Sequence, residues 1–195
     1  MSAPHQGSFR TASGEVKQVE VLDSELASFP YAKTDTFEAV ALPCNDGYML
    51  AVLPMPGRNL SSLERELAEE PEAVDNALKN QPGIVTMPTF RIRFNADLRE
   101  HIEEIGIKEV FRDLGPLIKI KKSHLTQVAQ DTEIQVDNNG IRANAETVVG
   151  AIYGGIGSAR DYFHMELNRP FLFFVRDRNT NALLFLGAVV DPSQE

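Results

Sequence analysis

The run Gly154-Gly155-Ile156-Gly157 is the part of this sequence that comes nearest to a ligand-binding motif. Glycine-rich turns bind phosphate when a strand precedes them and an amphipathic helix follows, because backbone N–H groups at the start of the helix point at the anion. No amphipathic helix pattern follows residue 157, and the HExxH, GxSxG and GxxxxGK motifs are absent. We therefore expect a flexible loop here, with no enzyme active site and no cofactor.

The histidines and the single cysteine form no pattern that is typical of metal ligands or of an activated nucleophile. They are His5, His101, His124, His164 and Cys44. The histidines lie at no metal-ligand spacing, and Cys44 falls in an expected turn without a neighbouring base to activate its thiol. Carboxylates over 64–72 and 100–104 belong to polar helix faces, where solvation accounts for them. We predict no metal site.

A segment that begins at Gly140 alternates small or apolar residues with polar ones. In an extended conformation one face would carry Ile141, Ala143, Ala145 and Thr147, and the other face would carry Arg142, Asn144 and Glu146. Such a strand could join a sheet with its first face inward, each new ladder hydrogen bond contributing about 1 kcal/mol. A shift of one residue would bury two charges, so the register would be strongly specified. The pattern alone favours a segment that can join a sheet over a merely polar loop, which stays the alternative.

The charge of the chain limits its partners. It has 28 acidic and 19 basic residues, a formal net charge of −9 at pH 7. Because like charges repel, we expect neither nucleic acid nor a membrane surface as a partner. The first 14 residues lack the apolar core of a signal peptide, and a single cysteine cannot form an intrachain disulfide.

The elements that would position this segment can be read from hydrophobic patterns. Residues 37–43 with 48–54, and 170–175 with 182–190, predict two hairpins buried on both faces. Short helices are expected over 60–67, 71–78 and 98–105, the last ended by Gly106. Residues 84–94 and 124–137 predict strands, residues 140–168 an exposed glycine-rich loop, and residues 1–19 an extended or disordered lead-in.

Several motifs resemble the serpin family. The most specific is NRPFLFFVRD (168–177), followed by LFLG (184–187) and VDP (190–192). Others agree in order, namely AVALP (39–43), VTMPTF (85–90) and VDNNG (136–140). Because serpins are about twice this length, the resemblance implies the C-terminal half of a serpin-type α+β fold, a partial domain over 20–195. It would hold two strands of the central sheet, at 84–94 and 124–137, and a reactive loop at 140–168.

The resemblance also implies a mechanism and its residues. In a serpin a serine protease cuts the loop and is trapped as an acyl-enzyme when the loop inserts into the central sheet. The hinge would be 140–147, and the cut bond would be Gly154-Gly155, which suits an elastase-like protease. A shift by one residue would place Tyr153 before the cut and favour a chymotrypsin-like protease, and Arg160 is a third position.

Two alternatives to an independent inhibitor remain. One is a non-inhibitory serpin-type binding or carrier protein, since Asn138, Asn139, Ile141 and Arg142 differ from the residues usual in inhibitory hinges. The other is an inactive truncated serpin, because the insertion slot would lie between one strand of this chain and one that it lacks. We therefore expect inhibition only with a complementary N-terminal serpin fragment. The resemblance implies an extracellular location, and the lack of a signal-peptide pattern leaves the cytoplasm open.

Overall fold

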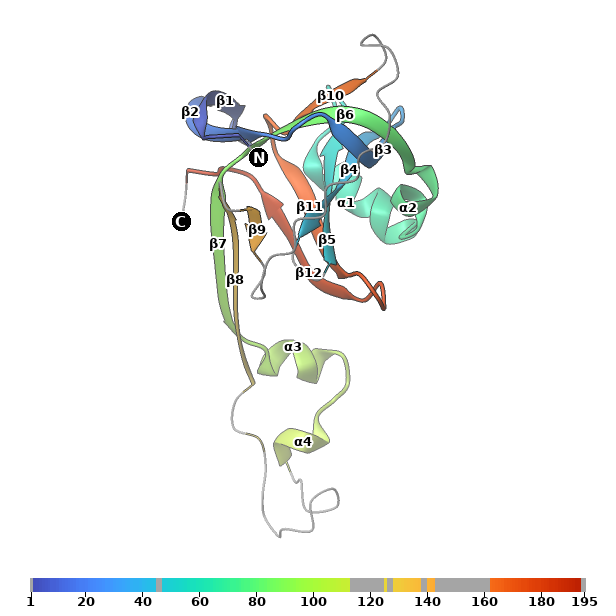
Figure 1. Ribbon diagram of the computed structural model, residues 1–195. Helices are drawn as coiled ribbons and strands as arrows, with labels where there is room; N and C mark the ends of the chain where they lie inside the picture. Colours follow the sequence, from blue (N-terminus) through green and yellow to red (C-terminus); the bar gives the residue numbers. More distant parts are fainter. Residues whose placement is uncertain are drawn as a thin grey trace. The chain divides into compact units, whose positions relative to one another are not determined.

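The computed structural model describes residues 2–44, 47–112, 125, 128–137, 140–142 and 162–193 (Figure 1). The chain forms two compact units, one comprising Met1–Arg91 with Ile134–Glu195 and the other Ile92–Glu133. Strands predominate and short helices accompany them. This mixture confirms the α+β class.

The described strands belong to two sheets. The large sheet has the order β1-β2-β6-β3-β4-β5-β11-β12, and β10 pairs with β6 beside this path. Its strands are β1 (His5–Arg10), β2 (Val16–Asp23), β3 (Ala27–Lys33), β4 (Phe37–Cys44), β5 (Gly47–Pro54), β6 (Lys79–Pro88), β10 (Phe163–Glu166), β11 (Phe171–Asp177) and β12 (Leu183–Val189). The small sheet has the order β7-β8-β9, with β7 (Phe90–Asp97), β8 (Ala129–Asp137) and β9 (Gly140–Arg142).

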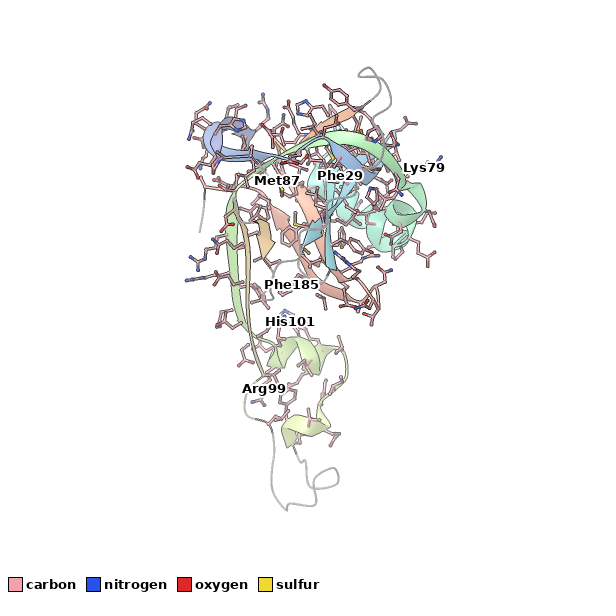
Figure 2. All side chains as sticks on the ribbon, in the orientation of Figure 1. Phe29, Lys79, Met87, Arg99, His101 and Phe185 are labelled. Atoms are coloured by element: carbon pink, nitrogen blue, oxygen red, sulfur yellow. The ribbon has the colours of Figure 1, made fainter. Side chains whose placement is uncertain are left out.

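Strands β4 and β5 are buried on both faces, as their uninterrupted apolar runs predict. On one face they pack against α1 (Leu60–Glu69) and α2 (Ala73–Ala77) through Leu63, Leu67 and Val74. Helix α1 starts where the Asn59 side chain accepts a hydrogen bond from the backbone N–H of Ser62 at 2.8 Å. Figure 2 shows buried Phe29 and Met87 among the strands of this unit.

One edge of β6 is shared by two strands, and its other edge carries β10. Thr86 is paired with Asp23 of β2 and with Glu166 of β10, and Gly83 is paired with Ala27 of β3 and with Phe163 of β10. A strand residue has only two neighbours across a sheet, so β2 and β3 must follow one another along the same edge. The strands β10, β6, β2 and β1 therefore form a continuous four-stranded region.

The single strand predicted over 84–94 is wrong, because the structure has two strands in different sheets. Residues 84–88 belong to β6 and residues 90–94 to β7. Pro88 has no N–H for a ladder, and the N–H of Thr89 instead bonds the carbonyl of Glu20 at 2.8 Å. The apolar pattern does not reveal this change of sheet, since both sides of the break are extended.

The lead-in predicted over residues 1–19 is extended rather than disordered. It forms β1, which pairs with β2 along its whole length, and Phe9 is fully buried. The boundary predicted at residue 20 falls inside β2. The polar composition of the first residues hides this hairpin, because a paired strand needs few apolar side chains to be ordered.

Two further expectations need correction. The segment expected as an exposed loop over 140–168 includes strand β10, in which Met165 is fully buried. The second hairpin is buried mainly in β11: Leu183, Leu184 and Leu186 of β12 are 52%, 54% and 61% exposed, although Val189 at its end is buried. Among the described strands β12 is the last of its sheet, with β11 as its neighbour, so an apolar sequence alone did not ensure its burial.

The smaller unit contains α3 (Arg99–Glu104) and α4 (Glu109–Arg112). The guanidinium carbon of Arg99 lies 5.2 Å from the centre of the Phe111 ring, a cation–π contact between these helices. Gly106 has φ +97°, a conformation that glycine adopts readily and that ends α3 as predicted.

Candidate reactive loop and its attachment strands

The predicted hinge begins as a strand of the small sheet. Gly140, Ile141 and Arg142 form β9, which runs antiparallel to β8. Their partners on β8 are Asp137, Val136 and Gln135, in that order. Because the sheet order is β7-β8-β9, β9 occupies the edge of β8 that is opposite to β7.

One face of β8 is partly apolar. Ile134 is 4% exposed and Val136 is 1% exposed, whereas Gln135 between them is half-buried. This alternation is typical of a strand with one face toward a core. A strand added beside β8 at this edge would therefore have one face toward the core and the other face more exposed to solvent.

The other predicted site residues lie outside the described residues. They are the remaining hinge residues Ala143, Asn144, Ala145, Glu146 and Thr147, the bond Gly154-Gly155, the alternative Tyr153 and the third position Arg160. Cys44 was expected in a turn, but it is the buried last residue of β4. Among the described residues, no group of three or more His, Cys, Asp and Glu side chains is placed to hold a metal ion.

The C-terminal end of the predicted loop is attached by an aromatic side chain. The Phe163 ring of β10 stacks on Tyr31, with ring centres 3.7 Å apart and planes 6° apart, and meets the edge of Phe29 at 6.3 Å. Gly83 lies beneath it: a Cβ at that position would be 2.2 Å from Phe163 Cε1. Only glycine leaves room for the ring in this place.

The chain just after β10 is held by a half-buried arginine. Arg169 donates from Nη2 to the carbonyl of Pro54 at 2.7 Å and from Nη1 to Asn168 Oδ1 at 3.2 Å. Burial lowers the pKa of the Arg169 guanidinium, an effect that the charge of Glu38 opposes. Together with Phe163, Arg169 ties the chain on this side of the loop to β3 and β5.

Tyr31, the stacking partner of Phe163, is fixed by Glu38. Its hydroxyl donates to Glu38 Oε1 at 2.5 Å, and both residues are buried. Burial, and then this hydrogen bond, raise the pKa of the Tyr31 hydroxyl above its usual value. The ring that supports Phe163 therefore stays neutral and fixed in orientation.

The end of the chain is tied to β2 by an ion pair that titrates. Lys17 Nζ lies 2.6 Å from Asp191 Oδ2, and this bond, with one from Ser193, lowers the pKa of the Asp191 carboxyl to about 2 from 3.8. A carboxylate with a lowered pKa in the folded state stabilises the fold above its unfolded pKa and stops doing so as pH falls through the folded value.

We therefore expect Asp191→Asn to lower the melting temperature at neutral pH. The difference from the unmodified chain should persist down to about pH 4 and vanish toward pH 2, where Asp191 becomes protonated. Thermal unfolding followed by circular dichroism from pH 2 to 7 would measure it. A difference that stays constant over this range would contradict a role for the ion pair.

Sequence reasoning missed Phe163, Gly83, Tyr31 and Arg169 as residues that hold the loop. A signal was present, since Phe163, Met165 and Leu167 alternate with polar residues just before the NRPF run. The glycine-rich stretch preceding them suggested one long loop instead. The pairing of β10 with β6 also requires contacts between residues about eighty positions apart, which no local pattern reports.

The described part of the chain has no helix that is both long enough and apolar enough to cross a membrane.

Comparisons with known proteins agree with this architecture. The family model described as Serpin (serine protease inhibitor) matches residues 2–192. Human Serpin B12 is 26% identical over 181 residues, which cover 89% of this chain and 42% of that protein. Human antithrombin-III is 28% identical over 195 residues, covering 94% of this chain and 41% of that protein.

A solved structure shares the fold. The thermophilic serpin tengpin in its native state superimposes with a TM-score of 0.74 at 24% identity, covering 97% of this chain and 50% of that one. The chain thus spans about half the length of the proteins that it matches. Its strand order, its C-terminal motifs and the extent of the family match lead to one conclusion: the chain belongs to the serpin family of serine protease inhibitors.

Proposed function

We propose that this chain is the loop-bearing part of a serine protease inhibitor that traps its target by loop insertion. The supporting observation is the antiparallel pairing of β9 with β8, because it starts a strand at the hinge. In the proposed mechanism the reactive loop starts at the hinge 140–147 and ends before β10, and the protease cuts Gly154-Gly155, or the bond after Tyr153. The target is then an elastase-like or a chymotrypsin-like protease.

The register of β8 and β9 suggests how the cut loop would insert. If the same pairing continues beyond Arg142, Ala143 falls opposite Ile134, Ala145 opposite Thr132 and Thr147 opposite Gln130. These positions share the face of β8 that is apolar at its Ile134 end. Small residues would therefore be inserted on the inner face, while Asn144 and Glu146 would remain on the outer face.

We also propose that a complementary N-terminal serpin fragment is a partner of this chain. The exposed leucines of β12 leave an apolar end of the large sheet open to solvent. Burying apolar surface contributes about 25 cal/mol per Å², so covering these side chains would stabilise an assembly. We propose an extracellular location from the family resemblance alone, with the cytoplasm as its alternative.

The test combines the two proposals in one experiment. The purified chain is incubated with elastase and with chymotrypsin, alone and after refolding with the N-terminal half of a serpin, and complexes are sought on denaturing gels. We expect a denaturant-resistant complex only in the refolded mixture, because insertion needs a strand on each side. Trapping by the purified chain alone would overturn the need for a partner.

A matched pair of variants controls for the assembly surface. Leu186→Lys puts a charge on the exposed end of the sheet. It should prevent binding of the N-terminal fragment and therefore the protease complex in the refolded mixture. Leu26→Lys adds the same charge at a position that is 46% exposed, between β2 and β3, and should not. If both variants behave alike, β12 is not the surface that binds the fragment.

A non-inhibitory binding or carrier protein is the second candidate. In the continued register Glu146 falls opposite Asp131, and like charges directly opposite each other destabilise a strand pair. This repulsion would destabilise the inserted strand, and trapping of a protease depends on that strand. Cleavage of the loop by either protease without any trapped complex, even in the refolded mixture, would favour this candidate.

A further inference from the structure

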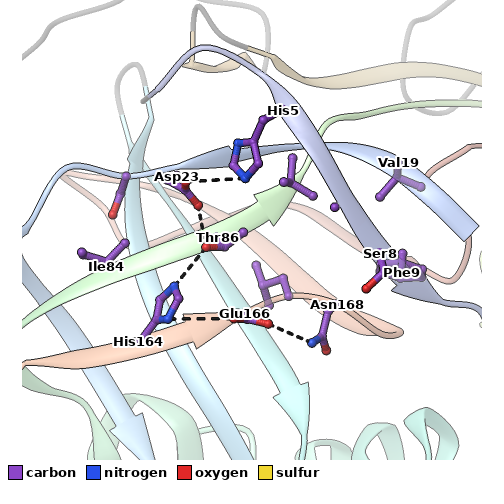
Figure 3. A pocket seen from close by; sticks show the side chains of 14 residues that line it. His5, Ser8, Phe9, Val19, Asp23, Ile84, Thr86, His164, Glu166 and Asn168 are labelled. Atoms are coloured by element: carbon purple, nitrogen blue, oxygen red, sulfur yellow. Dashed lines mark hydrogen bonds and ion pairs between the residues drawn. The ribbon is translucent and has the colours of Figure 1, made fainter. Parts of the chain in front are cut away.

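A pocket of about 480 Å³ lies on the four-stranded region β10-β6-β2-β1 (Figure 3). This volume is within the range of small-ligand sites, about 300–1,000 Å³. Buried Phe9, Val19 and Val21 give it an apolar part, and polar side chains from all four strands line the rest. The lining includes two carboxylates, Asp23 and Glu166, and no lysine or arginine.

The polar side chains of the pocket form one connected row. Thr86 Oγ1 donates to Asp23 Oδ1 at 2.6 Å, and Asp23 Oδ2 lies 3.7 Å from His5 Nε2. On the other side, Thr86 Oγ1 lies 3.2 Å from His164 Nε2, and His164 Nδ1 lies 3.9 Å from Glu166 Oε1. The remaining Glu166 oxygen, Oε2, accepts a hydrogen bond from Asn168 at 3.2 Å (Figure 3).

The Thr86 hydroxyl has a single proton, and the partner that receives it determines which nitrogen of His164 is protonated. Since that proton goes to Asp23, Thr86 Oγ1 can only accept from His164, so Nε2 must carry the imidazole proton. In a neutral imidazole the other nitrogen, Nδ1, is then an acceptor. It faces Glu166 Oε1, also an acceptor, at 3.9 Å. When the imidazole is neutral, two acceptors thus lie side by side, and a single donor group that reaches both would satisfy them.

We propose that this pocket binds the side chain of a lysine or arginine from a polypeptide partner. Its ammonium or guanidinium group would donate to both His164 Nδ1 and Glu166 Oε1, and its methylene stem would lie on Phe9, Val19 and Val21. The two carboxylates supply charge complementarity; the Asp23 side chain is 38% exposed and that of Glu166 is 53% exposed. Hydrogen bonds between charged partners are stronger than neutral ones. His164 and Glu166 belong to β10, at the C-terminal end of the predicted loop, and the binding proposed here does not depend on protease inhibition.

The test is a titration of the full chain with Nα-acetyl-lysine methylamide, followed by NMR of the histidine Cε1–H signals. The sequence has four histidines, of which His5 and His164 line the pocket. We expect saturable shifts of these two signals at millimolar probe, with the signal of His101 in α3 unchanged. The same probe acetylated on its side-chain nitrogen keeps the stem but has no charge, and should cause no such shifts.

Variants decide whether the named carboxylates are responsible. Glu166→Gln should weaken binding of the probe at least about fivefold, as expected for loss of a charged hydrogen-bond partner. Asp23→Asn should weaken it less, because it removes a negative charge from the pocket lining but no direct partner of the probe. Asp35→Asn makes the same charge change at an exposed position outside the pocket and should leave binding unchanged. The proposal is overturned if the neutral probe binds equally well, if no pocket histidine shifts, or if Glu166→Gln binds like the unmodified chain. Far-UV circular dichroism of each variant confirms that it is folded.

Discussion

We expect Ala145→Arg to abolish protease trapping by the reassembled inhibitor. In the continued register of β8 and β9, position 145 falls opposite Thr132, two residues along the strand from buried Ile134. Insertion of the cut loop would then place an unpaired guanidinium on the inner face of the sheet. Burying an unpaired charge costs several kcal/mol, and each 1.4 kcal/mol is a tenfold change in an equilibrium. The fraction of protease trapped should therefore fall by more than about tenfold.

The neighbouring position provides the control. Asn144→Arg introduces the same side chain one residue earlier, opposite Glu133, on the outer face. That arginine would stay hydrated and could pair with the carboxylate, so trapping should be retained. Denaturing gels of the complex and the molar ratio needed for full inhibition measure both variants. Equal loss in the two variants would show that the register proposed for the inserted strand is wrong.

The second large effect concerns the packing of the Phe163 ring on Gly83. We expect Gly83→Ala to destabilise the chain by about 2 kcal/mol, since the added Cβ would lie 2.2 Å from a ring carbon and overpacking of this kind costs about 1–3 kcal/mol. Phe163→Ala should cost a similar amount, about 2 kcal/mol, through the loss of aromatic contacts and buried area. Urea unfolding measures each change.

The double variant distinguishes direct packing of Phe163 on Gly83 from two independent losses of stability. When Phe163 is already alanine, the new methyl group has no ring to displace, so Gly83→Ala should become nearly neutral. The coupling free energy between the two sites should then exceed about 1 kcal/mol, as for residues in direct contact. Phe94→Ala removes the same ring from a position that is 51% exposed and should change stability little. Additive effects would mean that Gly83 does not hold Phe163 in place.

The packing of Phe163 on Gly83 also matters for the mechanism that we propose. In the proposed mechanism, insertion of the hinge beside β8 would draw the loop from one end, while β10 holds the chain after the loop to β6 through four residue pairs. Cutting the loop would release the hinge side from the restraint at β10. Hydrogen exchange at the β10 amides should be faster in Phe163→Ala than in the unmodified chain, because the strand loses its main apolar contact.

Much of the larger unit follows from local sequence. The apolar runs and turn residues of 37–54 and 170–190 correctly predict the pairs β4–β5 and β11–β12, because a hairpin joins segments that are close in sequence. Leu63, Leu67 and Val74 lie on the helix faces that their spacing predicts. In the smaller unit Gly106 ends α3, also as predicted. The terminal NRPFLFFVRD run was specific enough to identify the family.

The candidate sites depended on contacts that the sequence does not report. Pairing of β10 with β6, and of β6 with β2 and β3, brings Phe163 onto Gly83 and Thr86 between Asp23 and His164. Each histidine taken alone gave no reason to expect a binding pocket.

The sequence by itself determined the two apolar hairpins, the short helices and the family, because these follow from side-chain periodicity, short-range backbone preferences and a specific C-terminal motif. Only the tertiary structure decided which strands are neighbours, that residues 84–94 divide between two sheets, and that the leucines of β12 remain exposed. The physical reason is that an extended apolar segment can pair with many others, and the choice among them is made by packing between residues far apart in the chain.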